Sequence, residues 1–222
     1  DSLELDLELE DDDKNERYPI QLYHFVSSHV DIKDKNILEV GSGRGGGASY
    51  IARYLKPFSI TGIDISNEAV NLCSKFYDVP NLNFLYGDSE NIPFSDNSFD
   101  VLINIESSHC YGDMSKFLSE AYRTLKKDGF FLFCDFRTLD GLQELYDQLS
   151  SSDFKFLNRI DITSNIIQGL DKLSEYREDQ IDKSVSVFIK KLFKTYAGIK
   201  GTEIYNSFAN NSMVYICAIL KK

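Results

Sequence analysis

The stretch NILEVGSGRGGG, residues 36–47, decides the fold. It opens with a short apolar strand that carries one acid, Glu39, and continues into a loop with five glycines in seven residues. A helical pattern follows over residues 48–55. A strand that reaches a helix through a glycine-rich turn can cradle a nucleotide, because glycine lets the backbone approach a ligand and the helix start offers free N–H groups.

A second apolar strand, residues 59–63, strengthens this interpretation. It ends on Asp64, about 20 residues beyond the glycine loop, where a ribose-binding carboxylate is expected. The glycine motif alone also fits an ordinary tight turn. The loop and Asp64 together predict a site for an adenosine-containing cofactor.

The identity of that cofactor depends on Glu39. Gly41, Gly43 and Gly46 match the G-x-G-x-x-G spacing of dinucleotide sites, so an NAD-binding oxidoreductase stays open as an alternative. A carboxylate at position 39 would face a pyrophosphate unfavourably, whereas it suits a ligand that carries an ammonium and a sulfonium. S-adenosylmethionine is such a ligand.

At this point the chain resembles the class I S-adenosylmethionine-dependent methyltransferases, whose first motif is an apolar strand, an acid and G-x-G-x-G. The matching residues are Glu39, Gly41, Gly43 and Gly45. Residues 87–94, GDSENIPF, resemble the adenine loop of that family. The resemblance implies these cofactor-binding residues: Glu39, Gly41, Ser42, Gly43, Asp64, Ile65, Asp88, Ser89 and Asn104.

The run N-x-E-x-S-H-C-Y at residues 104–111 is similar to a narrower subgroup. That subgroup includes phthiotriolone-type lipid O-methyltransferases and the O-methyltransferase domains of modular polyketide synthases. The resemblance implies a hydroxyl acceptor on a polyketide-like chain, either as a small molecule or tethered to an acyl carrier protein. A carbon methyltransferase acting on a lipid or sterol-like molecule shares the fold and remains an alternative.

His109 is the candidate general base. It follows the buried strand 99–105, and chemistry in open α/β sheets gathers at the carboxyl ends of strands. Glu106 is the nearest carboxylate in sequence and is expected to orient the imidazole, with Asp135 as the second candidate. These three residues could also form a metal-assisted site, but nothing in their spacing requires it, and no metal is expected.

Strands are predicted at residues 83–86, 99–105 and 130–135, and they alternate with helices. Between the last two of these strands we expect a helix at 113–125 and a turn at 126–129. This alternation predicts an α/β, Rossmann-like, doubly wound and mostly parallel sheet, and the family resemblance implies seven strands. The strand-like segment 154–162 and the last strand, 213–220, are about 50 residues apart. We expect a helical substrate lid at about 163–210, with an extra packing layer as the alternative.

The net charge of −11 is concentrated in the leader. Residues 1–13 hold eight acids and no basic residue, so the other 209 residues carry only −3. We expect 1–14 to be a disordered linker before a methyltransferase domain at 15–222, with a helix from residue 16 that covers the cofactor or caps the sheet. Without a basic face, nucleic acid is not an expected partner.

The remaining composition is that of one globular domain of 222 residues, with 42% hydrophobic and 27% charged residues. Neither a membrane span nor a secretory signal is predicted. The four cysteines lack disulfide or metal spacing, which is typical of reduced thiols in a cytoplasmic protein. A start without methionine, together with the charged leader, suits a domain excised from a larger synthase polypeptide.

Overall fold

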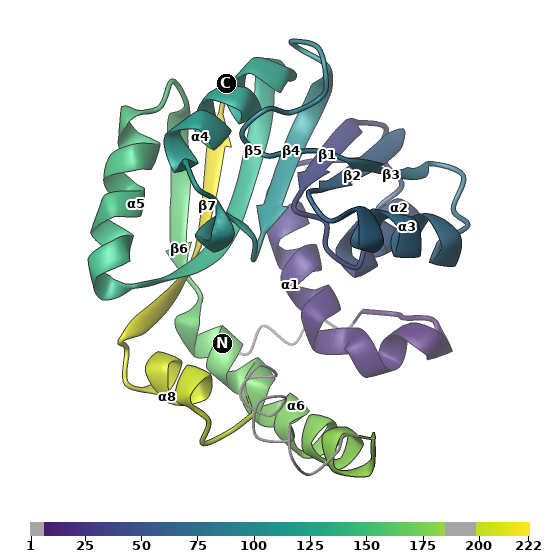
Figure 1. The fold of residues 1–222 in the computed structure, drawn as a ribbon, viewed down its shortest axis with the longest axis vertical. Helices are drawn as coiled ribbons and strands as arrows, with labels where there is room; N and C mark the ends of the chain where they lie inside the picture. The colour runs from purple at the N-terminus through teal and green to yellow at the C-terminus, as the bar shows by residue number, and fades with distance from the viewer. Residues whose placement is uncertain (1–6, 185–198) are drawn as a thin grey trace.

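A computed structural model describes residues 7–184 and 199–222. Its centre is a seven-stranded sheet with the order β3-β2-β1-β4-β5-β7-β6, in which β7 runs antiparallel to the other six strands (Figure 1). The predicted α/β, Rossmann-like, mostly parallel sheet is therefore confirmed. The strands are β1 (Asn36–Val40), β2 (Ser59–Asp64), β3 (Leu82–Tyr86), β4 (Phe99–Ile105), β5 (Leu125–Thr138), β6 (Lys155–Asp161) and β7 (Met213–Lys221).

The helices begin where side chains can cap them. The hydroxyl of Ser66 accepts a hydrogen bond from the Ala69 N–H, and the carboxylate of Asp113 accepts one from the Lys116 N–H, so each satisfies a free donor of a first helical turn. The helices are η1 (Asp11–Glu16), α1 (Arg17–Ser27), α2 (Gly46–Tyr54), α3 (Asn67–Phe76), η2 (Ser108–Cys110), α4 (Met114–Thr124), α5 (Leu139–Ser151), α6 (Thr163–Ser184) and α8 (Glu203–Ala209).

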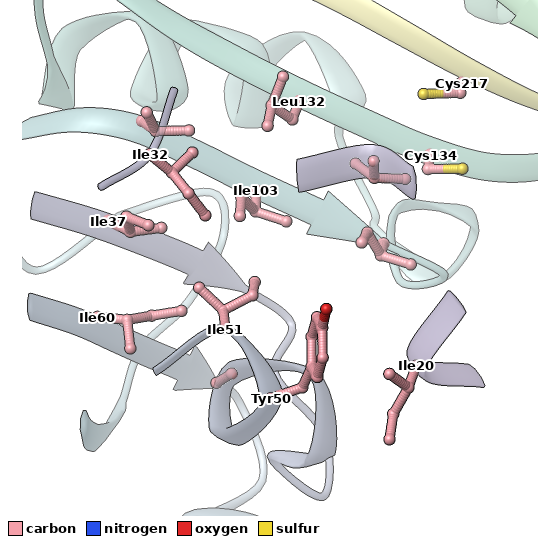
Figure 2. Packing of buried hydrophobic residues seen from close by; sticks show 14 of the residues in the cluster. Ile20, Ile32, Ile37, Tyr50, Ile51, Ile60, Ile103, Leu132, Cys134 and Cys217 are labelled. Atoms are coloured by element: carbon pink, nitrogen blue, oxygen red, sulfur yellow. The ribbon is translucent and has the colours of Figure 1, made fainter. Parts of the chain in front are cut away.

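Alternate residues of the strands build two cores, one on each face of the sheet. Ile37, Ile103 and Leu132 meet Ile20 of α1 and Tyr50 of α2 on one face, which Figure 2 shows. The opposite face packs against α4 and α5. Because both faces are covered, the central strands are apolar almost throughout, as a buried parallel sheet requires.

Residues 7–14 differ from the expected disordered linker. The carboxylate of Asp13 accepts hydrogen bonds of 2.6 and 2.9 Å from the Arg53 guanidinium and one of 2.6 Å from the Tyr54 hydroxyl, both on α2. Leu7 and Leu9 pack against the core. A local run of like charges could not indicate this order, since the compensating partners lie about 40 residues away. The expectation is wrong for residues 7–14, and residues 1–6 lie outside the described residues.

The turn expected at 126–129 lies inside β5 instead. The pairing of β4 with β5 shifts register there, since Phe99 pairs with Leu125 but Val101 pairs with Phe130. Asp128 takes a left-handed backbone with φ 64°. The extra residues are therefore absorbed as an irregularity of one continuous strand.

The expected lid region contains α6 and α8, while residues 185–198 of it lie outside the described residues. Figure 1 shows α6 on the side of the sheet toward which β4 points. Asp171 of α6 accepts a 2.8 Å hydrogen bond from Tyr205 of α8 and pairs with Lys200 at 3.0 Å. In the part of the chain that the structure describes, no helix has both the length and the apolar character needed to cross a membrane.

Candidate functional site

The glycine loop brings the end of β1 against the loop that follows β4. Gly41 has φ 77°, and a Cβ atom at this position would collide with the Ser107 side chain, so only glycine fits. The N–H groups of Gly41 and Ser42 donate to the Ile63 carbonyl at 2.8 and 3.0 Å. The loop is thus fixed between β2 and β4, at the point where the strand order reverses.

Asp64 holds the same loop in shape. One oxygen of its carboxylate accepts a hydrogen bond of 2.8 Å from the Gly43 N–H, and the other accepts one of 2.9 Å from the Ser66 N–H. Each carboxylate oxygen can accept a second hydrogen bond. Asp64 therefore keeps the capacity to accept ribose hydroxyls while it shapes the loop.

Glu39 is buried and only half satisfied. The Tyr23 hydroxyl of α1 donates to its Oε1 at 2.8 Å, while Oε2 is buried without a hydrogen-bond partner among the described residues. Burial raises the pKa of Glu39 to about 8, against the opposing effect of the Tyr23 hydrogen bond and with a further increase from the charge of Asp64. A buried carboxylate oxygen without a donor fits a ligand that brings an ammonium group.

The other expected cofactor contacts lie at the ends of adjacent strands. Ile65 follows β2 and exposes 66% of its surface, and Asp88 and Ser89 follow β3. Asp88 accepts a hydrogen bond from the Glu90 N–H at 2.9 Å, which fixes the turn. The buried Ser42 hydroxyl has no partner among the described residues. These groups, with Glu39 and Asp64, fit an adenosine ligand that carries an amino group.

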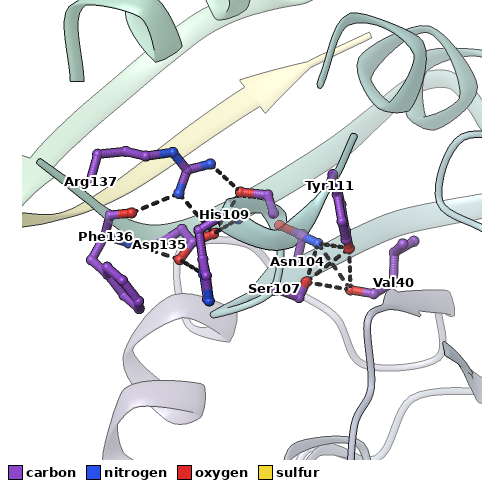
Figure 3. Close-up of polar contacts among 9 residues, drawn as sticks. Val40, Asn104, Ser107, His109, Tyr111, Asp135, Phe136 and Arg137 are labelled. Carbon is purple, nitrogen blue, oxygen red and sulfur yellow. Dashed lines mark hydrogen bonds and ion pairs between the residues drawn. The ribbon is translucent and has the colours of Figure 1, made fainter. Parts of the chain in front are cut away.

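Asn104 is placed differently from an exposed ligand contact. It is fully buried in β4, and its Nδ2 lies 2.9 Å from the Val40 carbonyl and 2.8 Å from both the Ser107 and Tyr111 hydroxyl oxygens (Figure 3). Its Oδ1 has no partner among the described residues. Asn104 thus fastens β4 to the end of β1, next to the glycine loop.

His109 lies on η2 and is oriented by Asp135. Its Nδ1 is 2.9 Å from Oδ1 of Asp135, and its backbone N–H donates to Oδ2 at 3.0 Å. The expectation that Glu106 orients the ring is wrong. Glu106 has a left-handed backbone with φ 52°, and after burial its carboxylate is the main cause that raises the pKa of Tyr215 on β7.

Asp135 is fully buried and held by several donors. The Ser108 hydroxyl donates to it at 2.6 Å, and a guanidinium nitrogen of Arg137 lies 3.1 Å away. Burial alone would raise its pKa, but the His109 hydrogen bond and the Arg137 charge outweigh burial, so the pKa of Asp135 is lowered. Asp135 is therefore ionised at neutral pH.

An ionised Asp135 dictates which nitrogen of His109 carries the proton. The carboxylate can only accept, so a neutral ring donates from Nδ1 and leaves Nε2 with a lone pair. No described residue forms a hydrogen bond with Nε2. Figure 3 shows this nitrogen directed away from the Asp135 network, and the ring packs on Phe136 with centroids 4.4 Å apart. The arrangement is that of a base aimed at an external proton.

Tyr23, Ser107 and Arg137 were absent from the sequence prediction, and Ser108 and Tyr111 entered it only as members of the run at residues 104–111, with no role. The proximity of Arg137 to Asp135 was predictable from the sequence, because residues two apart on a strand lie on the same face of the sheet. The contact of Tyr23 with Glu39 was not predictable, since it depends on how α1 packs against the sheet. Among the described residues, no group of three or more His, Cys, Asp or Glu side chains is arranged to hold a metal ion.

Comparison with known proteins gives the family. Residues 38–133 match a model described as a methyltransferase domain. The chain is 35% identical over 211 residues to a phthiotriol/phenolphthiotriol dimycocerosates methyltransferase of Mycobacterium tuberculosis, covering 95% of this chain and 78% of the relative. It is 32% identical over 207 residues to a fatty-acid O-methyltransferase of Mycolicibacterium smegmatis, covering 93% and 75%.

A solved structure has the same fold at much lower identity. It is a geranyl diphosphate C-methyltransferase from Streptomyces coelicolor in complex with Mg²⁺, geranyl diphosphate and S-adenosyl-L-homocysteine, with a TM-score of 0.69 at 15% identity over 97% of this chain and 85% of that one. With its glycine loop, Asp64 and half-satisfied Glu39, the chain belongs to the S-adenosylmethionine-dependent methyltransferase family that includes the mycobacterial phthiotriol/phenolphthiotriol dimycocerosates methyltransferases.

Proposed function

We propose that the protein methylates a hydroxyl oxygen of a lipid-like or polyketide-like acceptor, with His109 as the general base. The observation that carries this proposal is the Asp135–His109 pair, whose 2.9 Å hydrogen bond leaves Nε2 free of any described partner. A hydroxyl is a poor nucleophile until its proton is removed, and an imidazole titrates near neutral pH. A base at this position suits a hydroxyl acceptor, whereas an acceptor group that is already nucleophilic would not need a base.

The residues around His109 divide the work. Bound S-adenosylmethionine supplies an activated methyl group. With the cofactor bound, Nε2 of His109 would take the proton of the acceptor hydroxyl and so make its oxygen nucleophilic. Asp135 stabilises the imidazolium that results, while Ser108 and Arg137 keep the carboxylate in place. Asp135 is thus a positioning residue in this proposal.

The cofactor end of the site is proposed as follows. Glu39 receives the ammonium group, Asp64 the ribose, and Asp88, Ser89 and Ile65 the adenine, with Gly41, Ser42 and Gly43 lining the methionine portion. Asn104 holds β4 against the loop through the Val40 carbonyl. Support comes from the placement of these residues at the ends of four adjacent strands.

The acceptor class rests on the relatives and on the lid region. By their names, the relatives act on phthiotriol or phenolphthiotriol dimycocerosates and on fatty acids, and a fatty acid is an apolar chain with one polar end. Helices α6 and α8, in the described part of the expected lid, would keep such a chain out of water beside His109. In a narrower form of this proposal, the acceptor is bound to an acyl carrier protein and this chain is a domain of a larger synthase.

The decisive experiment compares wild type with His109→Ala on a hydroxylated fatty acyl substrate, free and loaded on an acyl carrier protein. Methyl transfer is expected to fall by about 100-fold or more, while the Kd of S-adenosylhomocysteine stays within a few-fold. His24→Gln serves as the control, because Nδ1 of His24 lies 2.6 Å from the Tyr50 hydroxyl oxygen and the residue is not part of the Asp135–His109 pair.

Three results would contradict the proposal. Unchanged turnover of His109→Ala would remove the general base. An equal loss of cofactor affinity would make His109 part of the pocket instead. A product whose new methyl group sits on carbon, by NMR, would replace O-methylation with the carbon methyltransferase alternative.

A further inference from the structure

Two buried cysteines face each other across the β5–β7 pair. Cys134 and Cys217 are register partners in this antiparallel ladder, and both are fully buried in the core cluster beneath α1. Figure 2 shows the two thiols on neighbouring strands. Directly opposite residues of antiparallel strands point to the same face of the sheet, so both sulfur atoms lie on the α1 side.

The hydrogen-bond pattern shows which kind of pair they form. Just beyond the two ends of the ladder, the Lys222 N–H donates to the Gly129 carbonyl and the Leu139 N–H donates to the Ser212 carbonyl. Hydrogen-bonded pairs recur at every second residue, so they fall on the odd-numbered residues of β5. Cys134 is therefore in a non-hydrogen-bonded pair, whose Cα atoms are about 4.5 Å apart. Disulfides span Cα distances of about 4.4–6.8 Å, so the backbone already permits a bond.

A base accompanies the thiols. His29 follows α1, and its Nε2 is buried without a hydrogen-bond partner among the described residues. The Cys134 thiol and the His29 imidazole both lower the pKa of the Cys217 thiol, while burial raises the pKa of Cys134. His29 acts on Cys217, which is therefore the sulfur next to the base, and Cys134 is its partner across the ladder.

We propose that Cys134 and Cys217 form a redox-active dithiol, which a hydroperoxide converts to a cross-strand disulfide with His29 as the base. The Cys217 thiolate attacks a peroxide oxygen, the O–O bond breaks, and a sulfenic acid forms with release of water or alcohol, which takes the proton from His29. Cys134 sulfur then attacks the sulfenic sulfur and displaces hydroxide, which leaves as water with the Cys134 proton. Two thiols lose two electrons and one peroxide gains them.

The reaction is gated by the cover over the thiols. Because Ile20 and Val26 of α1 belong to the same buried cluster, peroxide reaches Cys217 only when this helix opens locally from the sheet. The new bond would lie beside Asp135, which follows Cys134 directly and orients His109. Oxidation would therefore brace the strand that carries the general-base pair.

The test treats the full chain with hydrogen peroxide under native conditions and maps the products by mass spectrometry of peptides digested without reduction. The expected result is a Cys134–Cys217 crosslink and the loss of two of the four free thiols. His29→Gln should slow formation of this crosslink by about tenfold without preventing it. Cys73→Ser is the control, since the buried Cys73 thiol donates to the Gly43 carbonyl and has no role in the pair.

Two outcomes would overturn the inference. In one, only the exposed Cys110 is oxidised while Cys134 and Cys217 stay reduced or are over-oxidised separately. In the other, the crosslink forms at the same rate in His29→Gln as in wild type, and His29 is then not the base. The wild-type map decides the first point even if a Cys217→Ser variant does not fold.

Discussion

At the scale of single residues, Glu39 is the buried carboxyl that the proposed function places against the ammonium group of the cofactor. Its pKa of about 8 arises mainly from burial, and Oε2 has no donor among the described residues. At pH 7 the side chain is therefore mostly protonated in the ligand-free protein. A nearby positive charge favours the carboxylate, so binding of an ammonium ligand must lower this pKa.

We therefore predict that S-adenosylhomocysteine binding releases a proton from Glu39 between about pH 6 and 8. Calorimetric titration in buffers of different ionisation enthalpy measures this release. In Glu39→Gln the release is expected to shrink to the contribution of the ligand's own amino group, and affinity is expected to fall. Identical proton release by the two proteins would show that Glu39 is already ionised without ligand.

His109 and Asp135 show why residue roles were only partly predictable. The position of His109 after a buried strand was readable, since carboxyl ends of strands gather functional groups. The choice between Glu106 and Asp135 was not, because it depends on the left-handed backbone of Glu106 and on the register between β4 and β5. Proximity in sequence favoured Glu106 as the residue that orients His109, but the pairing of β4 with β5 places Asp135 next to it.

At the scale of elements, the segment η1–α1 is fastened to the helix that follows the glycine loop. The Asp13 carboxylate receives two hydrogen bonds from Arg53 and one from Tyr54. The Arg53 hydrogen bond is the largest cause that lowers the pKa of Asp13, against burial. A carboxyl whose pKa is lowered by folding stabilises the protein above its unfolded pKa, and this stability is lost as the pH falls through the folded value.

Asp13→Asn is accordingly expected to lower the free energy of unfolding by about 1 kcal/mol at pH 7. The difference from wild type should disappear as the pH falls through the lowered folded pKa of Asp13, because the wild-type carboxyl is then protonated too. Chemical denaturation at several pH values provides the measurement. The control is Asp12→Asn, the same substitution at the exposed neighbouring residue, which should leave the free energy of unfolding unchanged at any pH. Equal losses of this free energy in both variants would refute a specific Arg53 contact.

The elements themselves were largely predictable, and the exceptions have physical reasons. Strands β1, β2 and β4 follow from apolar runs that end in Gly, Asp or Glu, and α3 and α4 from the caps Ser66 and Asp113. The turn at 126–129 was mistaken for a strand boundary because turn chemistry also suits a bulge. The order of residues 7–14 was missed because its partners, Arg53 and Tyr54, are distant in sequence.

At the scale of the whole molecule, the proposed cofactor residues lie on parts of the fold that are far apart in the sequence. Glu39, Asp64 and Asp88 end three adjacent strands, and Tyr23 links α1 to Glu39. A ligand held by all of these parts stabilises the entire folded domain against unfolding. Binding should therefore appear as a shift of the global transition.

S-adenosylhomocysteine at 100 times its Kd is expected to stabilise the fold by about 2.7 kcal/mol. For a domain of this size that corresponds to a rise in Tm of roughly 5 to 10 °C. Thermal unfolding by calorimetry or dye fluorescence checks it, with NADH at the same concentration as the comparison. A larger shift with NADH would restore the dinucleotide interpretation of Gly41, Gly43 and Gly46.

The antiparallel position of β7 has a consequence for the time at which activity arises during synthesis. β5 carries Asp135, yet one of its two neighbours, β7, is Met213–Lys221, made about 75 residues later. A nascent chain that has emerged from the ribosome only as far as β5 leaves that edge unpaired, including the backbone around Asp135 opposite Ile216. The glycine loop can form before β7 is made, whereas the strand pairing around Asp135 is complete only once residues 213–221 have left the ribosome.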